Sequence, residues 1–145
     1  MVEWSSRQNV FTQGKNTRML ELPLQDQCDV IYVPCLLANP STGEQCMIDA
    51  VWDTGSQRTA ISEEAFKALG LKRGEQAQVQ GSAGISEGWE TVCKVSITEY
   101  DQWEVEVDVL PQLPVHMVIG MDIISTGNMS LAYEESGYTF RFEQL

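Results

Sequence analysis

The feature that most constrains the fold of this chain is the turn at residues 53–56, which reads Asp-Thr-Gly-Ser. It directly follows the apolar run at 50–52, which ends a segment that reads as the second strand of a hairpin. Asp53 is therefore expected where this strand stops, and Gly55 would let the backbone approach its carboxylate closely. The sequence thus predicts an acidic group held on a tight turn at the end of a buried strand.

Short apolar or alternating segments, separated by turn residues, fill most of the chain after residue 18. They are expected as strands at 30–37, 45–52, 77–80, 91–97, 103–110, 117–120, 129–133 and 138–142. Ser62 as a helix N-cap and Gly70 as a stop predict one short helix between them, and 121–125 is expected to form a single helical turn. The pattern predicts a mainly β, closed-barrel-like domain over residues 19–145, preceded by an irregular arm over residues 1–18.

Composition limits the partners of this domain. The 145 residues suffice for one domain, and 9 Lys and Arg against 21 Asp and Glu give a net charge of −12. This charge argues against nucleic acid or an anionic membrane as a partner. Four dispersed cysteines and one histidine predict no metal site, and no cofactor is expected. With no signal-like or membrane-spanning segment in the sequence, a cytoplasmic protein with reduced thiols is expected.

The residues around Asp53 indicate a chemistry that one copy of the turn does not complete. Two carboxylates that share one proton can activate a water and polarise a carbonyl, whereas a single carboxylate cannot do both. The Ser56 hydroxyl could donate to the carboxylate and favour its charged form, which would lower the first pKa of such a pair. The Thr54 hydroxyl could bond across a symmetric interface. Because the chain holds one such turn, a homodimer is expected.

Two other residues with reactive side chains are given structural roles. Asp122 lies beside the expected helical turn and lacks the Thr-Gly that follows Asp53, so a helix cap is favoured over a second catalytic acid. His116 is expected to be a strand-end surface residue, because no serine or cysteine in a nucleophile motif accompanies it.

With these motifs in place, the chain resembles the retropepsin-like aspartic proteases, the single-domain dimeric relatives of pepsin, which include cellular and bacterial members. The resemblance covers roughly residues 19–142 and keeps the family's order of parts. These are the turn at 53–56, the segment 59–62 with its helix, a glycine-rich flap hairpin at 81–88, the apolar-apolar-Gly stretch 118–120, and a final hairpin.

The resemblance implies an aspartic endopeptidase that acts on a peptide or protein substrate. Asp53 from each subunit would form the catalytic dyad, with active-site support from Thr54, Gly55 and Ser56. The flap would close over an extended peptide. The residues expected to bind substrate are Gly55, Gln57, Arg58, Ser82, Ala83, Gly84 and Ile119.

The sequence also departs from the family pattern. Gln57 and Met121 occupy positions where viral members carry an Asp and an Arg that pair at the dimer interface, and the bulky Trp52 precedes the catalytic position. No N-terminal strand that would pair with a C-terminal one is evident. A catalytically silent peptide-binding or dimerisation module with the same fold is therefore the alternative, and a heterodimer with another Asp-Thr-Gly chain is a third possibility.

Overall fold

The computed structural model describes residues 19–24, 30–81, 84–97, 102–135 and 137–145. Ten strands and two short helices follow one another in this part of the chain. They are β1 (Met19–Leu24), β2 (Tyr32–Ala38), β3 (Gln45–Trp52), β4 (Ala60–Ile61), α1 (Glu63–Ala68), β5 (Gln76–Gly81), β6 (Gly84–Ser96), β7 (Gln102–Val109), β8 (Met117–Ile119), α2 (Met121–Ile124), β9 (Gly127–Glu134) and β10 (Gly137–Gln144). The predicted mainly β fold is confirmed, and the predicted arm over residues 1–18 lies outside the described residues.

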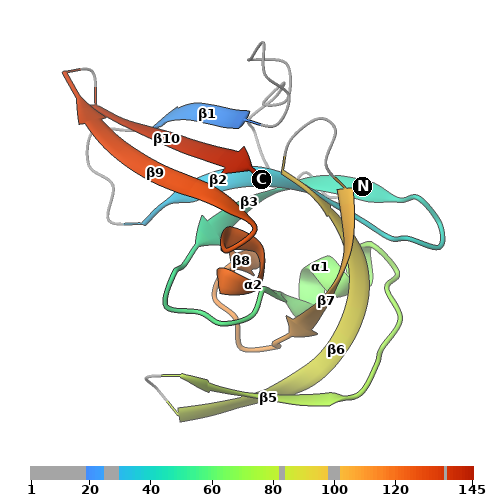
Figure 1. Ribbon diagram of the computed structural model, residues 1–145. Coiled ribbons are helices and arrows are strands. Elements are labelled where there is room, and N and C mark those ends of the chain that lie inside the picture. Colours follow the sequence, from blue (N-terminus) through green and yellow to red (C-terminus); the bar gives the residue numbers. More distant parts are fainter. Residues whose placement is uncertain (1–18, 25–29, 82–83, 98–101, 136) are drawn as a thin grey trace.

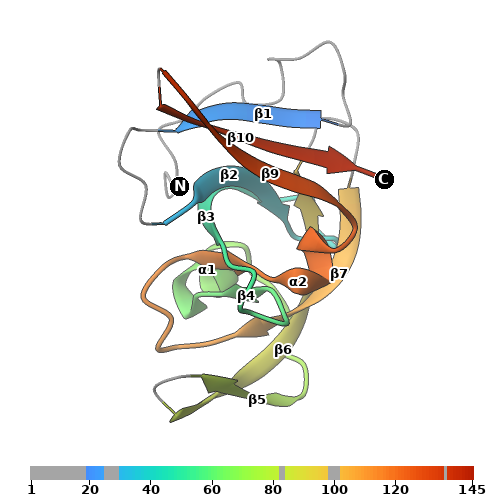
Figure 2. The same ribbon diagram turned by 60° about the vertical axis from the view of Figure 1, so that its left-hand side comes forward.

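The strands form two sheets. The larger sheet has the order β2-β3-β8-β4-β7-β6-β5, and an additional pairing of β2 with β6 turns it back on itself. The smaller sheet has the order β1-β10-β9. In both Figure 1 and Figure 2 the smaller sheet lies at one end of the molecule and the β5–β6 hairpin at the opposite end. Neither helix in the described part of the chain is long and apolar enough to cross a membrane.

Strand β1 differs from the expectation that no N-terminal strand pairs with the C-terminal hairpin. It pairs antiparallel with β10 over its whole length, from Met19 opposite Glu143 to Leu24 opposite Tyr138. Its three leucines are buried and alternate with more exposed residues. Pro23 is tolerated because β1 is an edge strand. Six residues that include a proline give a weak strand signal, and pairing with β10 supplies what local propensity lacks.

Helix α1 begins and ends as its sequence predicts. The Ser62 side chain accepts a hydrogen bond from the Ala65 N–H at 3.1 Å, and Glu63 and Glu64 lie in the first turn. Gly70 follows the C-cap with a φ of 63°, a left-handed conformation that favours glycine.

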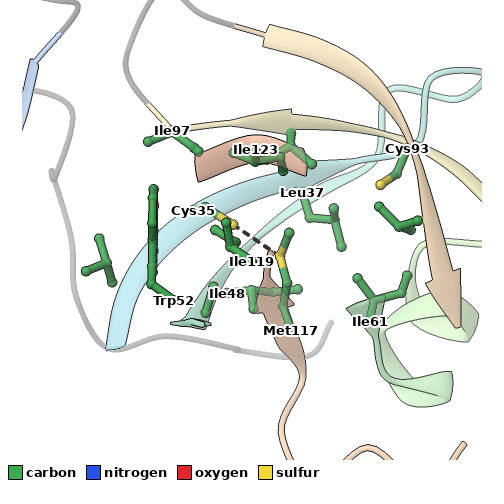
Figure 3. Close-up of a cluster of buried hydrophobic side chains, with 14 of the residues drawn as sticks. Cys35, Leu37, Ile48, Trp52, Ile61, Cys93, Ile97, Met117, Ile119 and Ile123 are labelled. Atoms are coloured by element: carbon green, nitrogen blue, oxygen red, sulfur yellow. Dashed lines mark hydrogen bonds between the residues drawn. The ribbon is translucent and has the colours of Figure 1, made fainter. Parts of the chain in front are cut away.

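The core joins both sheets and both helices. Its fully buried members include Ile48 and Ile61 from the larger sheet and Phe140 and Phe142 from β10. Figure 3 shows the part of this core around Cys35, whose thiol donates to the Met117 sulfur at 3.3 Å.

Candidate active site

The Asp53 turn lies between β3 and β4 and is anchored through β8. The Asp53 N–H donates to the Ile119 carbonyl at 2.9 Å, next to the parallel register that sets Trp52 opposite Ile119. The Ser56 N–H donates to the Asp53 carbonyl at 3.1 Å and closes the turn. The strand end thus fixes the backbone that carries the carboxylate.

The Asp53 carboxylate is exposed and is held by one backbone donor. The Gly55 N–H lies 2.8 Å from Asp53 Oδ1, and a Cβ on Gly55 would lie 3.2 Å from the same oxygen. Glycine therefore allows the close approach that makes this bond, as the sequence predicted. Within the described residues no second donor reaches this carboxylate, which leaves it open toward solvent.

The flanking hydroxyls behave differently from each other. The Ser56 hydroxyl donates to the Arg58 carbonyl at 2.9 Å, so in the single chain it closes the loop and does not donate to Asp53. The sequence predicts a hydrogen bond from this hydroxyl to the Asp53 carboxylate, and the single chain does not form it. Thr54 is exposed on the tip of the turn, where a second chain could reach it.

The stretch after β8 supports the loop from below. The first two N–H groups of helix α2 donate hydrogen bonds to the loop. The Met121 N–H donates to the Ser56 carbonyl at 2.8 Å, and the Asp122 N–H donates to the Gln57 carbonyl at 3.1 Å. These donors have no partner within a helix, so the loop carbonyls satisfy them. The short helix and the loop therefore hold each other in place.

Gly120 is required by this close packing. A Cβ at this position would lie 2.8 Å from the carbonyl carbon and oxygen of Arg58 and 2.8 Å from the Ser56 carbonyl oxygen. These atoms belong to the backbone and cannot rotate away. The apolar-apolar-Gly stretch noticed in the sequence thus packs under the loop, as expected.

The Asp122 carboxylate fixes the far end of the loop. It accepts hydrogen bonds from the Thr59 N–H at 3.0 Å, from the Thr59 hydroxyl at 2.8 Å and from the Ile123 N–H at 3.0 Å. The Thr59 hydroxyl in turn accepts from the Gly120 N–H at 3.2 Å. Asp122 is therefore a structural residue, but not the helix cap that the sequence predicts, because it lies inside α2 and Gly120 is the N-cap. Its main partner, Thr59, is one that the sequence does not indicate.

Some of the residues expected to bind substrate are exposed in the structure and others are not. Gln57 is exposed on the loop, and Gly84 is exposed with a φ of 117° at the start of β6. Ser82 and Ala83, which are also expected to bind substrate, lie outside the described residues.

Ile119 was also expected to contact substrate, but its side chain is 0% exposed. It lies among the buried side chains drawn in Figure 3. Because β8 runs through the middle of the larger sheet, this position has no surface to offer a ligand in the present conformation.

Arg58 contacts acidic residues of the protein itself. Its Nη2 atom lies 3.1 Å from Asp108, 3.7 Å from Glu90 and 3.8 Å from Glu106. From the sequence, Arg58 could contact substrate, acidic neighbours or solvent, and the identity of the acids is not indicated. A signal exists in the alternation of β7, because Glu106 and Asp108 occupy the positions between the valines that face the core.

Burial and crowding affect the charges in this cluster. Burial raises the pKa of the Asp108 carboxyl, and the nearby Arg58 guanidinium opposes that shift. A side-chain hydrogen bond with Glu106 raises the pKa of Glu90, with desolvation and the Glu106 charge acting in the same direction. One cation thus faces three carboxylates, two of which hold their protons more tightly than usual.

Other groups with possible chemistry have structural surroundings. The Ser62 hydroxyl caps α1 and lies 3.3 Å from His116 Nδ1, which is 3.9 Å from Glu64. Cys35, Cys46 and Cys93 are free, and burial raises the pKa of Cys46 to about 11 and that of Cys93 to about 12, so both are poor nucleophiles near neutral pH. No group of three or more potential metal ligands occurs among the described residues.

Comparisons with known proteins agree on the fold. One similar structure is EIAV protease in complex with the inhibitor HBY-793, at 17% identity and a TM-score of 0.53, covering 70% of this chain and 91% of that one. Another is a retropepsin-like aspartic protease from Rickettsia conorii, at 15% identity and a TM-score of 0.54, covering 83% of this chain and 97% of that one. At these identities the likeness establishes the fold. A search of curated protein sequences found no match.

The sequence itself places the chain in a family. Residues 42–126, more than half of the chain, match the family described as gag-polyprotein putative aspartyl protease. The matched segment contains the Asp53 turn, the β5–β6 hairpin and the supporting stretch through Asp122. The chain therefore belongs to the gag-polyprotein putative aspartyl protease family, and its fold is that of the retropepsin-like aspartic proteases.

Proposed function

We propose that this protein is an aspartic endopeptidase whose active site forms when two copies of the chain bring their Asp53 carboxylates together. The observation that carries the proposal is the exposed Asp53 carboxylate, held by the Gly55 N–H at 2.8 Å on a loop that Gly120 and α2 support. A buried or internally paired carboxylate would not be available to a second chain. The membership of the aspartyl protease family agrees with this chemistry.

In the proposed reaction the two Asp53 carboxyl groups share one proton and bind one water between them. The ionised carboxylate removes a proton from the water while the protonated one donates to the carbonyl oxygen of the peptide. In the resulting gem-diol intermediate the carboxyl group that took the water proton gives a proton to the amide nitrogen, and the other carboxylate takes a proton from a diol hydroxyl as the C–N bond breaks. The amine and the new carboxylic acid leave, and each carboxyl group returns to the state in which it began.

The remaining loop residues have positioning and binding roles in this proposal. Thr54 lies at the exposed tip, where its hydroxyl can bond to the same loop of the second subunit. The backbone of Gly55 and the side chain of Gln57 face solvent beside the carboxylate, where an extended peptide can form backbone hydrogen bonds. Gly84 would cover the bound peptide, as the sequence also leads us to expect of Ser82 and Ala83.

The test is digestion of a peptide library between about pH 3 and pH 7, with product termini identified by mass spectrometry. A carboxylate dyad predicts a bell-shaped profile. The Asp53→Asn variant should keep the circular dichroism spectrum of the folded parent. Its kcat should be at least about 100-fold lower, since it lacks the group that moves the proton. Glu44→Gln, which removes one exposed negative charge from the β2–β3 turn, is the matched control and should cleave like the parent.

Equal cleavage by the Asp53→Asn variant would contradict the proposal. Peptide binding by a chain that stays monomeric at all concentrations and cleaves nothing would instead support the non-catalytic module.

A further inference from the structure

The Arg58 side chain links the Asp53 loop to another part of the fold. Its Nη2 atom lies within 3.8 Å of carboxylates on Glu90, Glu106 and Asp108. The shortest contact, 3.1 Å, is to Asp108, whose side chain is 4% exposed, whereas the Arg58 side chain is 44% exposed. The guanidinium thus reaches from a solvent-facing loop to a nearly buried acid.

Glu90 belongs to β6, which forms the flap hairpin with β5, and the other two acids belong to β7, which pairs with β6 beyond that hairpin. Glu90 of β6 is directly opposite Asp108 of β7 in the antiparallel register. On the N-terminal side of Glu90, β6 pairs with β5. These two strands form the hairpin that lies opposite the smaller sheet in Figure 1. A displacement at the base of this hairpin therefore reaches the Arg58 side chain through its ion pairs.

The backbone of the loop at Arg58 is fixed on its other side. The Arg58 carbonyl accepts from the Ser56 hydroxyl and lies against Gly120, where no Cβ fits. The next residue, Thr59, accepts a hydrogen bond on its carbonyl from the Asp108 N–H at 3.1 Å. The loop is therefore clamped between β8 with α2 below it and the β6–β7 pair beside it.

We propose that Arg58 is a positioning residue of the proposed peptidase. Its side chain ties the loop that carries Asp53 to the paired strands β6 and β7, next to the base of the flap hairpin. The inference rests on the proposed function, and it assigns to Arg58 a role that needs no contact with substrate. Because the same Nη2 atom makes all three ion pairs, a compact cation at this position retains the link. Removal of the charge takes the ion pairs out of this lateral support and leaves the backbone hydrogen bond between Thr59 and Asp108 as its remaining part.

Electrostatics argue that this cluster serves geometry more than stability. Burial raises the pKa of Asp108 even though Arg58 opposes the shift, so the ionised acid is costly in this position. An ion pair that desolvates one of its acids adds little to the free energy of folding compared with an uncharged pair, and its role here is to fix the relative position of the groups it joins. The activity should therefore depend on the cluster more steeply than the melting temperature does.

The kinetic test compares Arg58→Gln, Arg58→Lys and Asp108→Asn with the parent. Arg58→Gln and Asp108→Asn should each lower kcat by roughly 10- to 100-fold with little change in KM, since a small displacement of a catalytic group costs rate rather than binding. Arg58→Lys should recover most of the loss. The double variant Arg58→Gln/Asp108→Asn should be no worse than the poorer single variant, because both break one link.

The matched control is Arg73→Gln, which removes the same charge. Arg73 stacks on Trp89, the neighbour of Glu90 in β6, with 4.1 Å between its guanidinium carbon and the ring centroid. Among the described residues no ion pair joins it to the Asp53 loop. Its kcat should match that of the parent. A rise in KM at constant kcat in Arg58→Gln would overturn the proposal in favour of substrate contact, and unchanged kinetics would also overturn it.

Hydrogen exchange separates this inference from the proposed activity. Amides of residues 53–59 should exchange faster in Arg58→Gln than in the parent and in Arg73→Gln, whether or not the protein cleaves peptides. If the parent cleaves nothing but exchange rises as expected, the proposed function fails and the link through Arg58 remains. If exchange over 53–59 is unchanged, the link itself is wrong.

Discussion

Asp122 illustrates how one carboxylate in this chain can be structural while another is available for chemistry. Its two oxygens accept three hydrogen bonds from Thr59 and Ile123, whereas the Asp53 carboxylate accepts one and faces solvent. Hydrogen bonds to a charged acceptor are strong and fix geometry. The number of donors around each carboxylate thus distinguishes Asp122, which supports the loop, from Asp53, which we propose to be the reactive group.

We expect Asp122→Asn to destabilise the fold by about 1–3 kcal/mol, because an amide cannot accept the same set of N–H and O–H donors. Thermal unfolding measures this loss. The variant should keep a measurable rate of peptide cleavage, in contrast to Asp53→Asn. An Asp122 variant that unfolds like the parent but is inactive would mean that Asp122 takes part in the reaction.

A second prediction concerns Gly120. Substitution by alanine places a Cβ 2.8 Å from backbone atoms of Ser56 and Arg58, so the loop must shift, and we expect a loss of about 1–3 kcal/mol together with reduced activity. Gly81→Ala is the control for stability. Its Cβ would meet its nearest neighbour, the Gly84 carbonyl oxygen, at 3.9 Å, which is ordinary contact. Equal melting temperatures for the two variants would show that the loop tolerates the displacement.

At the scale of elements, the acidic residues of β6 and β7 make the stability depend on pH. The pKa values of Asp108 and Glu90 are raised in the folded chain, so the folded state binds these protons more tightly than the unfolded state does. Their protonation therefore favours folding. This contribution is complete below the ordinary carboxyl range and is lost as pH rises through the raised pKa values.

Arg58 moderates this effect, because its charge lowers the pKa of both acids. Arg58→Gln should raise these pKa values further, with Glu106 and Asp122 as the remaining charges that act on Asp108. We therefore expect the melting temperature of Arg58→Gln to fall below that of the parent by more at pH 7.5 than at pH 4.5. A difference that is the same at both pH values would argue against the ion pairs.

The elements also show what the sequence could predict. Local signals sufficed for α1, with its Ser62 cap and Gly70 stop, and for the apolar run that ends at Asp53, because short-range hydrogen bonds and burial decide both. They did not suffice for β1, which depends on pairing with β10, more than a hundred residues away. The sequence does not identify the acidic partners of Arg58 for the same reason, because the register of β6 with β7 determines which acids lie together.

At the scale of the whole molecule, the proposed site is half of an active site. A homodimer predicts that activity falls more steeply than protein concentration on dilution, with a midpoint that matches the dissociation seen by analytical ultracentrifugation. The loss should be reversible on concentration. Activity strictly proportional to concentration, from a species with the mass of one chain, would contradict the dimer.

Mixing subunits provides a stricter test. When the parent is mixed with an equal amount of Asp53→Asn and allowed to exchange, random pairing into dimers should leave about half of the parent's activity. Mixing with Glu44→Gln should instead add activity. Undiminished activity in the Asp53→Asn mixture, under conditions where exchange of labelled subunits is demonstrated, would show that each chain works alone.

Trp52 gives the molecule an optical property that follows from its place in the fold. Its indole is 4% exposed, lies 5.0 Å from the Phe140 ring and 5.1 Å from the Phe142 ring, and precedes Asp53 directly in the chain. Its fluorescence should therefore be that of an indole shielded from water, and subtraction of the Trp52→Phe spectrum isolates it from the other tryptophans. The chain carries a built-in emission probe one residue from the carboxylate, so arrival of a peptide or a second subunit can be timed without a label.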